Sequence, residues 1–287
     1  MEGTSQILIT GSGGQLGRDV ALAAQASDRA VVAVDRSALD LTDTAALTSM
    51  LDEVRPDAVI NCAAYTAVDD CESQPDLAHA VNEHAVTSLA EACRSAGAHL
   101  VHISTDYVFD GTLDRPYHEL DAVNPQSVYG RSKLAGELAA TNVLGDAATI
   151  VRTSWVCGEF GNNMVKLVRR LAGAGSPMAF VNDQRGCPTF TADLAPALLH
   201  LADDRHGGTF HLTNAGAVSW YEFVGEVLVA SGFDRSMVTS ITTDELVPPR
   251  PAPRPANSVL DNRRWAASGR TPLRHFSEPL AELVARL

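Results

Sequence analysis

The sequence predicts an α/β fold, with a doubly wound parallel sheet in the first half of the chain and a smaller mixed α/β region after it. Short apolar runs recur through the first half, and they are continuous rather than alternating, which is typical of strands covered on both faces. Helical stretches separate these runs with short connections, as in a parallel sheet. A cluster of glycines follows the first run directly, at the kind of strand-to-helix turn where such folds bind ligands.

The first elements are predicted on either side of the glycine cluster. Residues 7–10 are apolar and lead into the glycines. Residues 15–26 carry apolar or small side chains at helical spacing, which predicts a helix that begins as the glycines end. Residues 30–34 form the second apolar run, and it ends at Asp35.

The later elements continue the alternation. A helix over residues 42–54 is predicted to begin beside Asp43 and to stop before Pro56, because proline cannot continue a helix. A helix over residues 83–96 closes at Gly97, a favoured helix end. The remaining predicted elements are strands at 58–61, 99–104 and 147–152, and a helix at 128–144.

The regular alternation of apolar runs and helical stretches ends after Thr153. We therefore predict one domain over residues 1–153, completed by short later segments, and a second over residues 154–287. The second contains a basic helical stretch near residues 164–172 and a proline-rich passage at 248–255, which is predicted to be an extended surface loop. That loop is either a rigid connector or an arginine-bearing loop that closes on a ligand.

Composition limits the classes of function. The 287-residue chain is 45% hydrophobic, and its formal net charge of -13 makes nucleic-acid binding improbable. No apolar stretch is long enough to span a bilayer, and no secretory leader is recognised, so no membrane association and a cytoplasmic location are expected. The five cysteines show no C-x-x-C pair, and the histidines show no zinc pattern, so no metal site is predicted.

The glycine cluster predicts a dinucleotide site on a Rossmann-like fold. Gly11, Gly14 and Gly17 follow a strand and open a helix. Glycine is needed there because the backbone turns tightly and approaches a pyrophosphate, while the helix N-terminus offers free N–H groups to the phosphates. Strand, spacing and helix agree, which favours a dinucleotide over a purely structural turn.

The choice between NADPH and NADH stays open at this stage. Asp35 ends the second strand, where an acidic side chain can accept hydrogen bonds from ribose hydroxyls and favours NADH. Arg36 follows it and is suited to the 2′-phosphate of NADPH. Asp40 and Leu41 are candidates for the border of the adenine site, or for a simple helix-entry turn.

Tyr129 and Lys133 are the candidates for proton transfer. Their i, i+4 spacing places both side chains on one face of a helix. A nearby ammonium is expected to lower the pKa of a tyrosine from its usual value of about 10. Thr105, with Ser104 as the alternative, ends a strand and is expected to hydrogen-bond the reacting carbonyl.

Together these residues resemble the extended short-chain dehydrogenase/reductase family, which acts on nucleotide sugars. The similarity covers about two-thirds of the chain. Several of its stretches are typical of the family's reductases of 4-keto sugar nucleotides. They are residues 9–17, 61–69, 104–111, 128–137, 152–156 and 182–184.

The resemblance implies a role for each matching residue. It places Gly14, Gln15 and Leu16 at the pyrophosphate, and Thr105, Tyr129 and Lys133 in the catalytic triad. It also places Ala63, Ala64 and Tyr65 near the nicotinamide, Thr105, Asp106 and Trp155 at the sugar, and Val68 and Asn257 at the nucleotide end.

The reaction implied is the NADPH- or NADH-dependent reduction of the C4 keto group of dTDP-4-dehydro-L-rhamnose to dTDP-L-rhamnose. The expected partner is this dTDP-sugar, bound by a monomer or a homodimer. In the second half, Asn163, Lys166 and Arg254 are candidate substrate contacts, and the two cations are suited to a diphosphate unless they are ordinary surface charges. Some relatives carry magnesium on glutamates at a dimer contact, but Asp19 and Ala192 stand at two of those places.

Two alternatives remain at this stage. One is a nucleotide-sugar epimerase or another reductase of the same fold. A dehydratase is disfavoured, because its threonine is followed by Asp-Glu, and Tyr107 stands in the place of that glutamate. The other alternative is a non-catalytic regulatory subunit, against which the intact Thr105, Tyr129 and Lys133 count.

Overall fold

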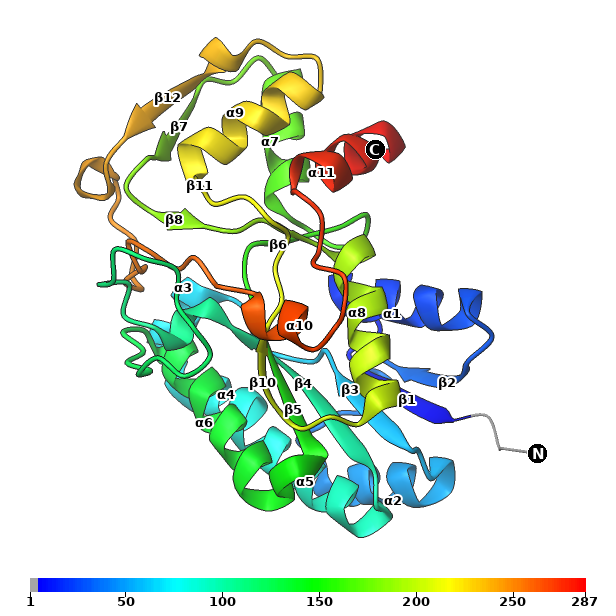
Figure 1. Ribbon diagram of the computed structural model, residues 1–287. Coiled ribbons are helices and arrows are strands. Elements are labelled where there is room, and N and C mark those ends of the chain that lie inside the picture. Colours follow the sequence, from blue (N-terminus) through cyan, green and yellow to red (C-terminus); the bar gives the residue numbers. More distant parts are fainter. Residues whose placement is uncertain (1–4) are drawn as a thin grey trace.

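A six-stranded parallel sheet forms the centre of the computed structural model, which describes residues 5–287 (Figure 1). The strands lie in the order β10-β5-β4-β3-β1-β2, and every neighbouring pair is parallel. The order reverses beside β1, which creates the crevice where doubly wound sheets bind ligands. The strands are β1 (Gln6–Thr10), β2 (Ala30–Val34), β3 (Ala58–Asn61), β4 (His99–Thr105), β5 (Ala148–Thr153) and β10 (Gly208–His211).

Helices cover both faces of the sheet, which explains why its strands are apolar without alternation (Figure 1). On one face, α1 (Gln15–Ala26) packs against α8 (Thr191–Asp204) over a buried cluster that includes Ile7, Ile9 and Leu198. On the other face, α2 (Thr44–Val54), α5 (Ala85–Ala96) and α6 (Val128–Leu144) cover a second buried cluster.

The predicted elements of the first half are confirmed, with small shifts at their ends. The helix predicted from residue 42 begins at Thr44, because the Asp43 side chain accepts hydrogen bonds from the N–H groups of Ala45 and Ala46 and caps it. The helix predicted from residue 83 is preceded by a π-helical turn, Ala80–His84, and by two short helices that the sequence pattern did not indicate. These are α3 (Val68–Ser73) and α4 (Pro75–His79).

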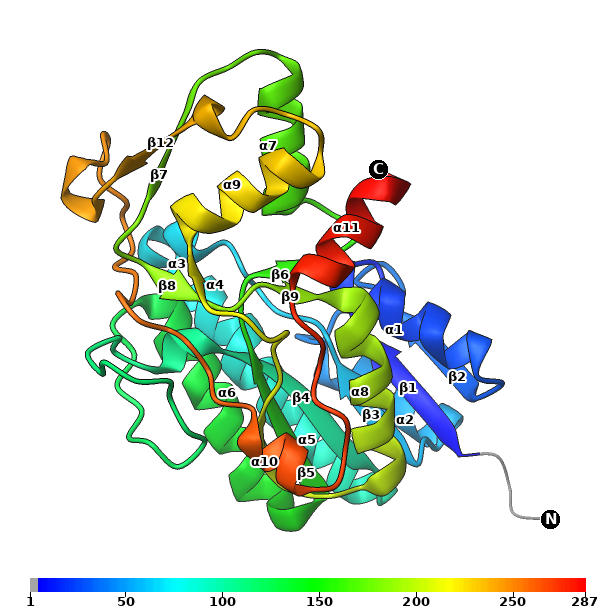
Figure 2. The ribbon, with the colours of Figure 1, turned by 45° about the horizontal axis from the view of Figure 1, so that its top comes forward.

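Much of the second half forms a smaller α/β unit, which gathers beside the sheet (Figure 2). Its core joins two helices that pack together, α7 (Met164–Gly173) and α9 (Trp220–Ala230), to the parallel strands β7 (Met178–Val181) and β12 (Val238–Ile241). The other elements of this half are β6 (Val156–Cys157), β8 (Arg185–Gly186), β9 (Thr189–Phe190), β11 (Val218–Ser219), α10 (Arg263–Ala267) and α11 (Ser277–Arg286).

Two segments of the second half belong to the sheet layer instead. β10 pairs with β5 at the edge of the sheet, and α8 packs on α1. The domain boundary near residue 153, with later segments completing the first domain, stays a prediction. Among residues 5–287, no helix combines the length and the apolar character needed to cross a membrane, and no three His, Cys, Asp or Glu side chains group as metal ligands would.

Candidate active site

The candidate site lies along the carboxyl edge of the sheet, where β1, β3 and β4 end. A cleft of about 460 Å³ opens beside the glycine loop. It is lined by nine of the predicted cofactor residues, Gly11, Gly14, Asp35, Arg36, Asp40, Leu41, Ala63, Ala64 and Tyr65, and by residues not predicted, among them Gly13, Ser37, Leu39, Thr42, Cys62, Leu77 and Val81.

Two of the glycines are required by the geometry of this loop. Gly11 has a φ of +72°, and a Cβ there would lie 2.7 Å from the backbone nitrogen of Ala63. A Cβ on Gly17 would lie 2.3 Å from the carbonyl oxygen of Gly11. The glycines therefore let the first turn of α1 pack against the loop that lines the cleft.

Gln15, Leu16 and Gly17 do not line this cleft. Leu16 is buried in the core under α1, and the Gln15 side chain points toward the second half of the chain. Gln15 donates to the carbonyl of Val156 at 3.0 Å and accepts from Asn163 Nδ2 at 2.7 Å. Asn163 caps α7 and thereby joins the glycine loop to the second unit, so the structure places it beside the predicted cofactor residues.

Asp35 and Arg36 differ in how firmly they are held. One oxygen of Asp35 accepts from Ser37 N, Ser37 Oγ and Ala38 N, and these bonds lower the pKa of its carboxyl group. Its other oxygen remains on the side of Gly13. Arg36 is 80% exposed and, among residues 5–287, its only ion pair is with Asp40, at 3.5 Å. Asp35 is thus a fixed acceptor, and Arg36 is a movable cation at the same end of the cleft.

Thr105 and Tyr129 are brought together at the end of β4. The Thr105 hydroxyl lies close enough to Tyr129 to oppose the rise in the pKa of Tyr129 that burial causes. Thr105 also donates to Asp106 Oδ1 at 3.0 Å and accepts from the backbone N–H of Tyr107. The ring of Tyr107 meets that of Tyr129 edge-on at 5.5 Å.

The expectation that Lys133 lowers the pKa of Tyr129 is wrong for this arrangement. Burial raises the pKa of Tyr129 instead, and Lys133 is not among the main groups that shift it. Lys133 Nζ donates to the carbonyl of Ile103 at 2.6 Å and lies 3.4 Å from His102 Nε2. Burial also lowers the pKa of Lys133 to about 8, so the lysine itself titrates near neutral pH.

Asp106 is a second unusual acid beside Thr105. It is buried, and burial raises the pKa of its carboxyl group to about 6. One of its oxygens, Oδ2, is buried without a hydrogen-bond partner among the described residues. Such an acceptor fits the predicted contact with a sugar hydroxyl.

Trp155 is held in a strained backbone conformation directly after β5. Its φ is +48°, a conformation that is unfavourable for a bulky residue and has to be stabilised by the packing of its side chain. Its ring stacks on Trp220 at 3.6 Å, and Gly186 leaves room for it, since a Cβ there would lie 2.6 Å from the indole. Trp220 is therefore a candidate functional residue that the sequence did not indicate.

The two predicted diphosphate cations lie in different surroundings. Lys166 Nζ donates to the carbonyls of Glu159 and Gly161, beside the glycine loop. Arg254 forms an ion pair with Asp69, the second residue of α3, and its charge opposes the rise in the pKa of Tyr107 that burial causes. Arg254 thus lies near Val68 and Tyr107, and Lys166 lies on the cofactor side.

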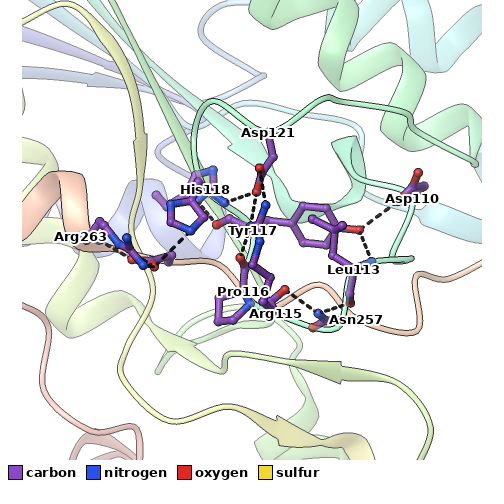
Figure 3. A network of polar contacts seen from close by, with 11 residues as sticks. Asp110, Leu113, Arg115, Pro116, Tyr117, His118, Asp121, Asn257 and Arg263 are labelled. Atoms are coloured by element: carbon purple, nitrogen blue, oxygen red, sulfur yellow. Dashed lines mark hydrogen bonds and ion pairs between the residues drawn. The ribbon is translucent and has the colours of Figure 1, made fainter.

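Asn257 holds a loop rather than pointing into an open site (Figure 3). Its side chain donates to the carbonyls of Leu113 and Arg115. Tyr117, in the same loop, is buried and donates to Asp110 at 2.9 Å. The segment after Asn257 pairs with the backbone of Tyr117, so these contacts fix the loop that follows the catalytic strand.

The sequence did not indicate three buried polar residues beside the site, Asn61, His102 and Asn82. Asn61, the last residue of β3, lies next to His102 in the middle of β4, and Asn82 Nδ2 donates to the carbonyl of Tyr65 and to Ser132 Oγ. A polar residue at the end of a buried strand was the available signal for Asn61. Nothing local indicates that Asn82, on the π-helical turn, reaches the site.

Comparison with known proteins agrees with this geometry. The family described as the RmlD substrate binding domain matches residues 5–287. A dTDP-4-dehydrorhamnose reductase of Streptomyces griseus is 45% identical over 280 residues, which cover 96% of this chain and 91% of that protein.

Two crystal structures share the fold. One, of a dTDP-4-dehydrorhamnose reductase from Clostridium acetobutylicum, is 43% identical, has a TM-score of 0.94 and aligns over 98% of this chain and 99% of that chain. The other, of a dTDP-4-dehydrorhamnose reductase from Bacillus anthracis in complex with NADP, is 33% identical, has a TM-score of 0.94 and aligns over 99% and 100%.

Proposed function

Because this chain belongs to the family of the RmlD substrate binding domain, we infer that it reduces the C4 keto group of dTDP-4-dehydro-L-rhamnose with NADPH. The product is dTDP-L-rhamnose, and the protein is an oxidoreductase of nucleotide-sugar biosynthesis. The observation that carries this function is the Thr105–Tyr129 pair at the end of β4, on the same sheet edge as the glycine-lined cleft.

The cleft has the features that a nicotinamide dinucleotide needs. Gly11 and Gly17 let the first turn of α1 pack against the glycine loop, and Gly13 and Gly14 line the cleft without side chains, so that a pyrophosphate can approach this loop. Asp35 offers a fixed acceptor for ribose hydroxyls, and Arg36 is free to turn to a 2′-phosphate. When bound, NADPH supplies the hydride.

The proposed catalytic roles follow from the buried pair. Thr105 and Tyr129 both offer a hydroxyl at one point, where they can hold the C4 carbonyl oxygen between them. As negative charge develops on that oxygen, the Tyr129 proton moves to it. The raised pKa of Tyr129 keeps the phenol protonated over the physiological range, which suits an acid that gives up its proton only in the transition state.

The substrate contacts are proposed from their places around this pair. Asp106 is suited to a sugar hydroxyl, and Trp155, stacked on Trp220, to an apolar face of the sugar. Val68 and Arg254 lie on the side of α3, where the nucleotide diphosphate is proposed to bind. Tyr107 fills the place where a dehydratase needs a glutamate, which supports reduction rather than elimination.

The test is an absorbance assay of NADPH oxidation with dTDP-4-dehydro-L-rhamnose. Oxidation that depends on the sugar nucleotide, with dTDP-L-rhamnose as the product, is expected. The control is dTDP-4-dehydro-6-deoxy-D-glucose, which carries the same keto group on a sugar of different configuration. Failure to oxidise NADPH with either sugar, by a protein that binds the cofactor, would overturn the proposal and favour a non-catalytic role.

A further inference from the structure

We propose that His102, held by Asn61 in the tautomer that carries its proton on Nε2, is a positioning residue that stabilises the neutral amine of Lys133 and so sets the pH at which Lys133 titrates. The consequence for turnover rests on the proposed reductase function. The titration of Lys133 does not, because it is a property of the protein alone.

The orientation of the Asn61 amide is decided by a backbone group. Its Oδ1 atom accepts from the N–H of Ala63 at 3.1 Å and from Thr10 Oγ1 at 2.8 Å. A backbone N–H can only donate, so this atom is the oxygen and the other is the nitrogen. Asn61 Nδ2 therefore donates to His102 Nδ1, 3.1 Å away.

The tautomer of His102 follows from that hydrogen bond. Since Nδ1 is an acceptor, a neutral ring carries its proton on Nε2. The ring stays neutral because two causes hold the pKa of His102 well below its usual value. The larger is burial, and the smaller is the positive charge of Lys133. The Nε2–H group then faces Lys133 Nζ, 3.4 Å away.

An N–H donor facing Lys133 favours the amine over the ammonium. The ammonium has three donors and no acceptor, so only the carbonyl of Ile103, at 2.6 Å, pairs with it on this side. The neutral amine also has a lone pair, and that lone pair can accept from His102 Nε2–H. Burial and this hydrogen bond therefore act in the same direction on Lys133.

The other titratable groups around Lys133 and His102 do not account for the effect of the His102 hydrogen bond on the pKa of Lys133. Glu137, one turn further along α6, raises the pKa of Lys133, but Arg152 and Ser104 bind both of its oxygens. The Cys62 thiol is the other titratable neighbour, and burial raises its pKa to about 12, so it is neutral near pH 8.

The packing of α6 brings Lys133 close to the ring. Gly136 lies on the same helix, and a Cβ there would lie 2.2 Å from the carbonyl oxygen of Asn82 and 3.5 Å from His102 Nε2. The helix can approach the π-helical turn this closely only with glycine at that position, and this packing lays the helix over His102. His102 is thus fixed by Asn61 on one side and covered by α6 on the other.

The consequence for turnover is a proton balance. After Tyr129 gives its proton to the substrate oxygen, a phenolate remains, and the ammonium of Lys133, one turn further along α6, is the proposed source of the proton that restores the phenol. That transfer leaves Lys133 as the amine, whose lone pair then accepts from His102 Nε2–H. A proton from solvent restores the ammonium before the next turnover.

The chain suits a direct measurement because it contains only two lysines, Lys133 and Lys166. Lysine labelled with ¹³C and ¹⁵N therefore gives two side-chain NMR signals, and the Lys166→Arg variant assigns them. In the parent protein, the Lys133 signal is expected to titrate near pH 8. Labelled histidine is expected to show His102 as a neutral ring with its proton on Nε2.

Two variants test the role of His102. His102→Phe keeps a flat ring but removes the donor, and the titration of Lys133 is expected to rise by about one pH unit, the size of one lost hydrogen bond. Asn61→Asp keeps the shape and the bonds to Thr10 and Ala63, but its carboxylate draws the proton to Nδ1. The lone pair on Nε2 then faces Lys133, so a larger rise is expected.

The alkaline limb of the kcat profile is expected to move with Lys133 in both variants, while the dissociation constant for NADPH stays within a few-fold of the parent value. An unchanged Lys133 titration in folded His102→Phe, or in Asn61→Asp if the first variant does not fold, would overturn the proposal. A proton found on Nδ1 in the parent would do the same. An inactive parent with the expected titration would instead count against the reductase function.

Discussion

Arg254 and Asp69 form a two-pronged ion pair that joins the proline-rich loop to the first turn of α3. Arg254 Nη2 lies 2.8 Å from Asp69 Oδ2, and Nη1 contacts Oδ1. Asp69 also accepts from the backbone N–H of Ala252, and Arg254 lowers the pKa of its carboxyl group to about 2. These contacts place the proline-rich loop beside the site, which favours a loop that closes on a ligand over a rigid connector.

Replacing Arg254 tests the assignment of this loop to the substrate. Arg254→Ala is expected to raise KM for the sugar nucleotide at least tenfold and to leave KM for NADPH almost unchanged, since Arg254 contacts α3 and Tyr107 rather than the glycine loop. Arg250→Ala is the matched control, because Arg250 is 54% exposed where Arg254 is 13% exposed. Kinetics with each substrate varied in turn decide it, and a change confined to the cofactor KM would refute the assignment.

Removing the Tyr129 hydroxyl tests the proposed acid. Tyr129→Phe keeps the edge-on packing with Tyr107 but removes the hydroxyl beside Thr105, and with it the proton. A fall in kcat of about 10²–10⁴-fold is expected, the usual contribution of a positioned acid. NADPH binding, followed by fluorescence titration, is expected to stay within a few-fold. Activity near that of the parent would show that another group supplies the proton.

Arg36 is expected to distinguish the two cofactors. Its side chain is exposed and pairs only with Asp40, so it can turn to a 2′-phosphate at little cost. Arg36→Ala should therefore raise KM for NADPH several-fold more than KM for NADH. Asp35→Ala is the complementary variant and should weaken both, because Asp35 also holds the turn through Ser37. Equal effects of Arg36→Ala on both cofactors would mean that Arg36 does not reach the phosphate.

Acid is expected to destabilise the fold through its buried neutral histidines. Burial lowers the pKa of His99 from 6.5 to about 4 and that of His211 from 6.5 to about 3. The unfolded chain therefore binds more protons than the folded one below pH 6.5, and the free energy of unfolding falls as the pH is lowered toward 3.

His99 offers the direct measurement of this effect. Its Nε2–H donates to Thr149 Oγ1, whose own proton goes to the carbonyl of His206. His99→Gln keeps an amide donor but cannot take up a proton. Its Tm should therefore fall less than that of the parent when the pH is lowered from 7 to 4.5. His200→Gln, at an exposed position, should lose as much as the parent. If His99→Gln also loses as much as the parent, His99 does not contribute to acid sensitivity.

The regular part of the sheet could be predicted from the sequence because each element carries its own signal. Continuous apolar runs marked the strands, helical spacing marked α1, and Asp43 and Pro56 marked the ends of α2. The glycine cluster and the Tyr129–Lys133 spacing were equally local. The comparisons confirm the family and the fold class that these residues indicated.

The segments that return to the sheet could not be placed in the same way. β10 and α8 join the sheet layer although they lie among the elements of the second unit in sequence, because β10 pairs with the edge of β5 and α8 packs on α1 over the buried face of the sheet. α3 and α4 are too short for periodicity to show. Asn163 and Asn257 were expected at the substrate, but their side chains hold loops to the glycine turn and to the 113–115 segment.

The sequence by itself determined which chemical groups this protein can use, since glycine, tyrosine, lysine and arginine carry their properties wherever they lie. Only the tertiary structure decided their protonation and their partners. Lys133 faces His102, Asp69 holds Arg254, and Tyr129 is buried beside Thr105 because segments distant in sequence meet at one edge of the sheet. The pKa of a side chain depends on desolvation and on neighbours across space, and no local pattern encodes either.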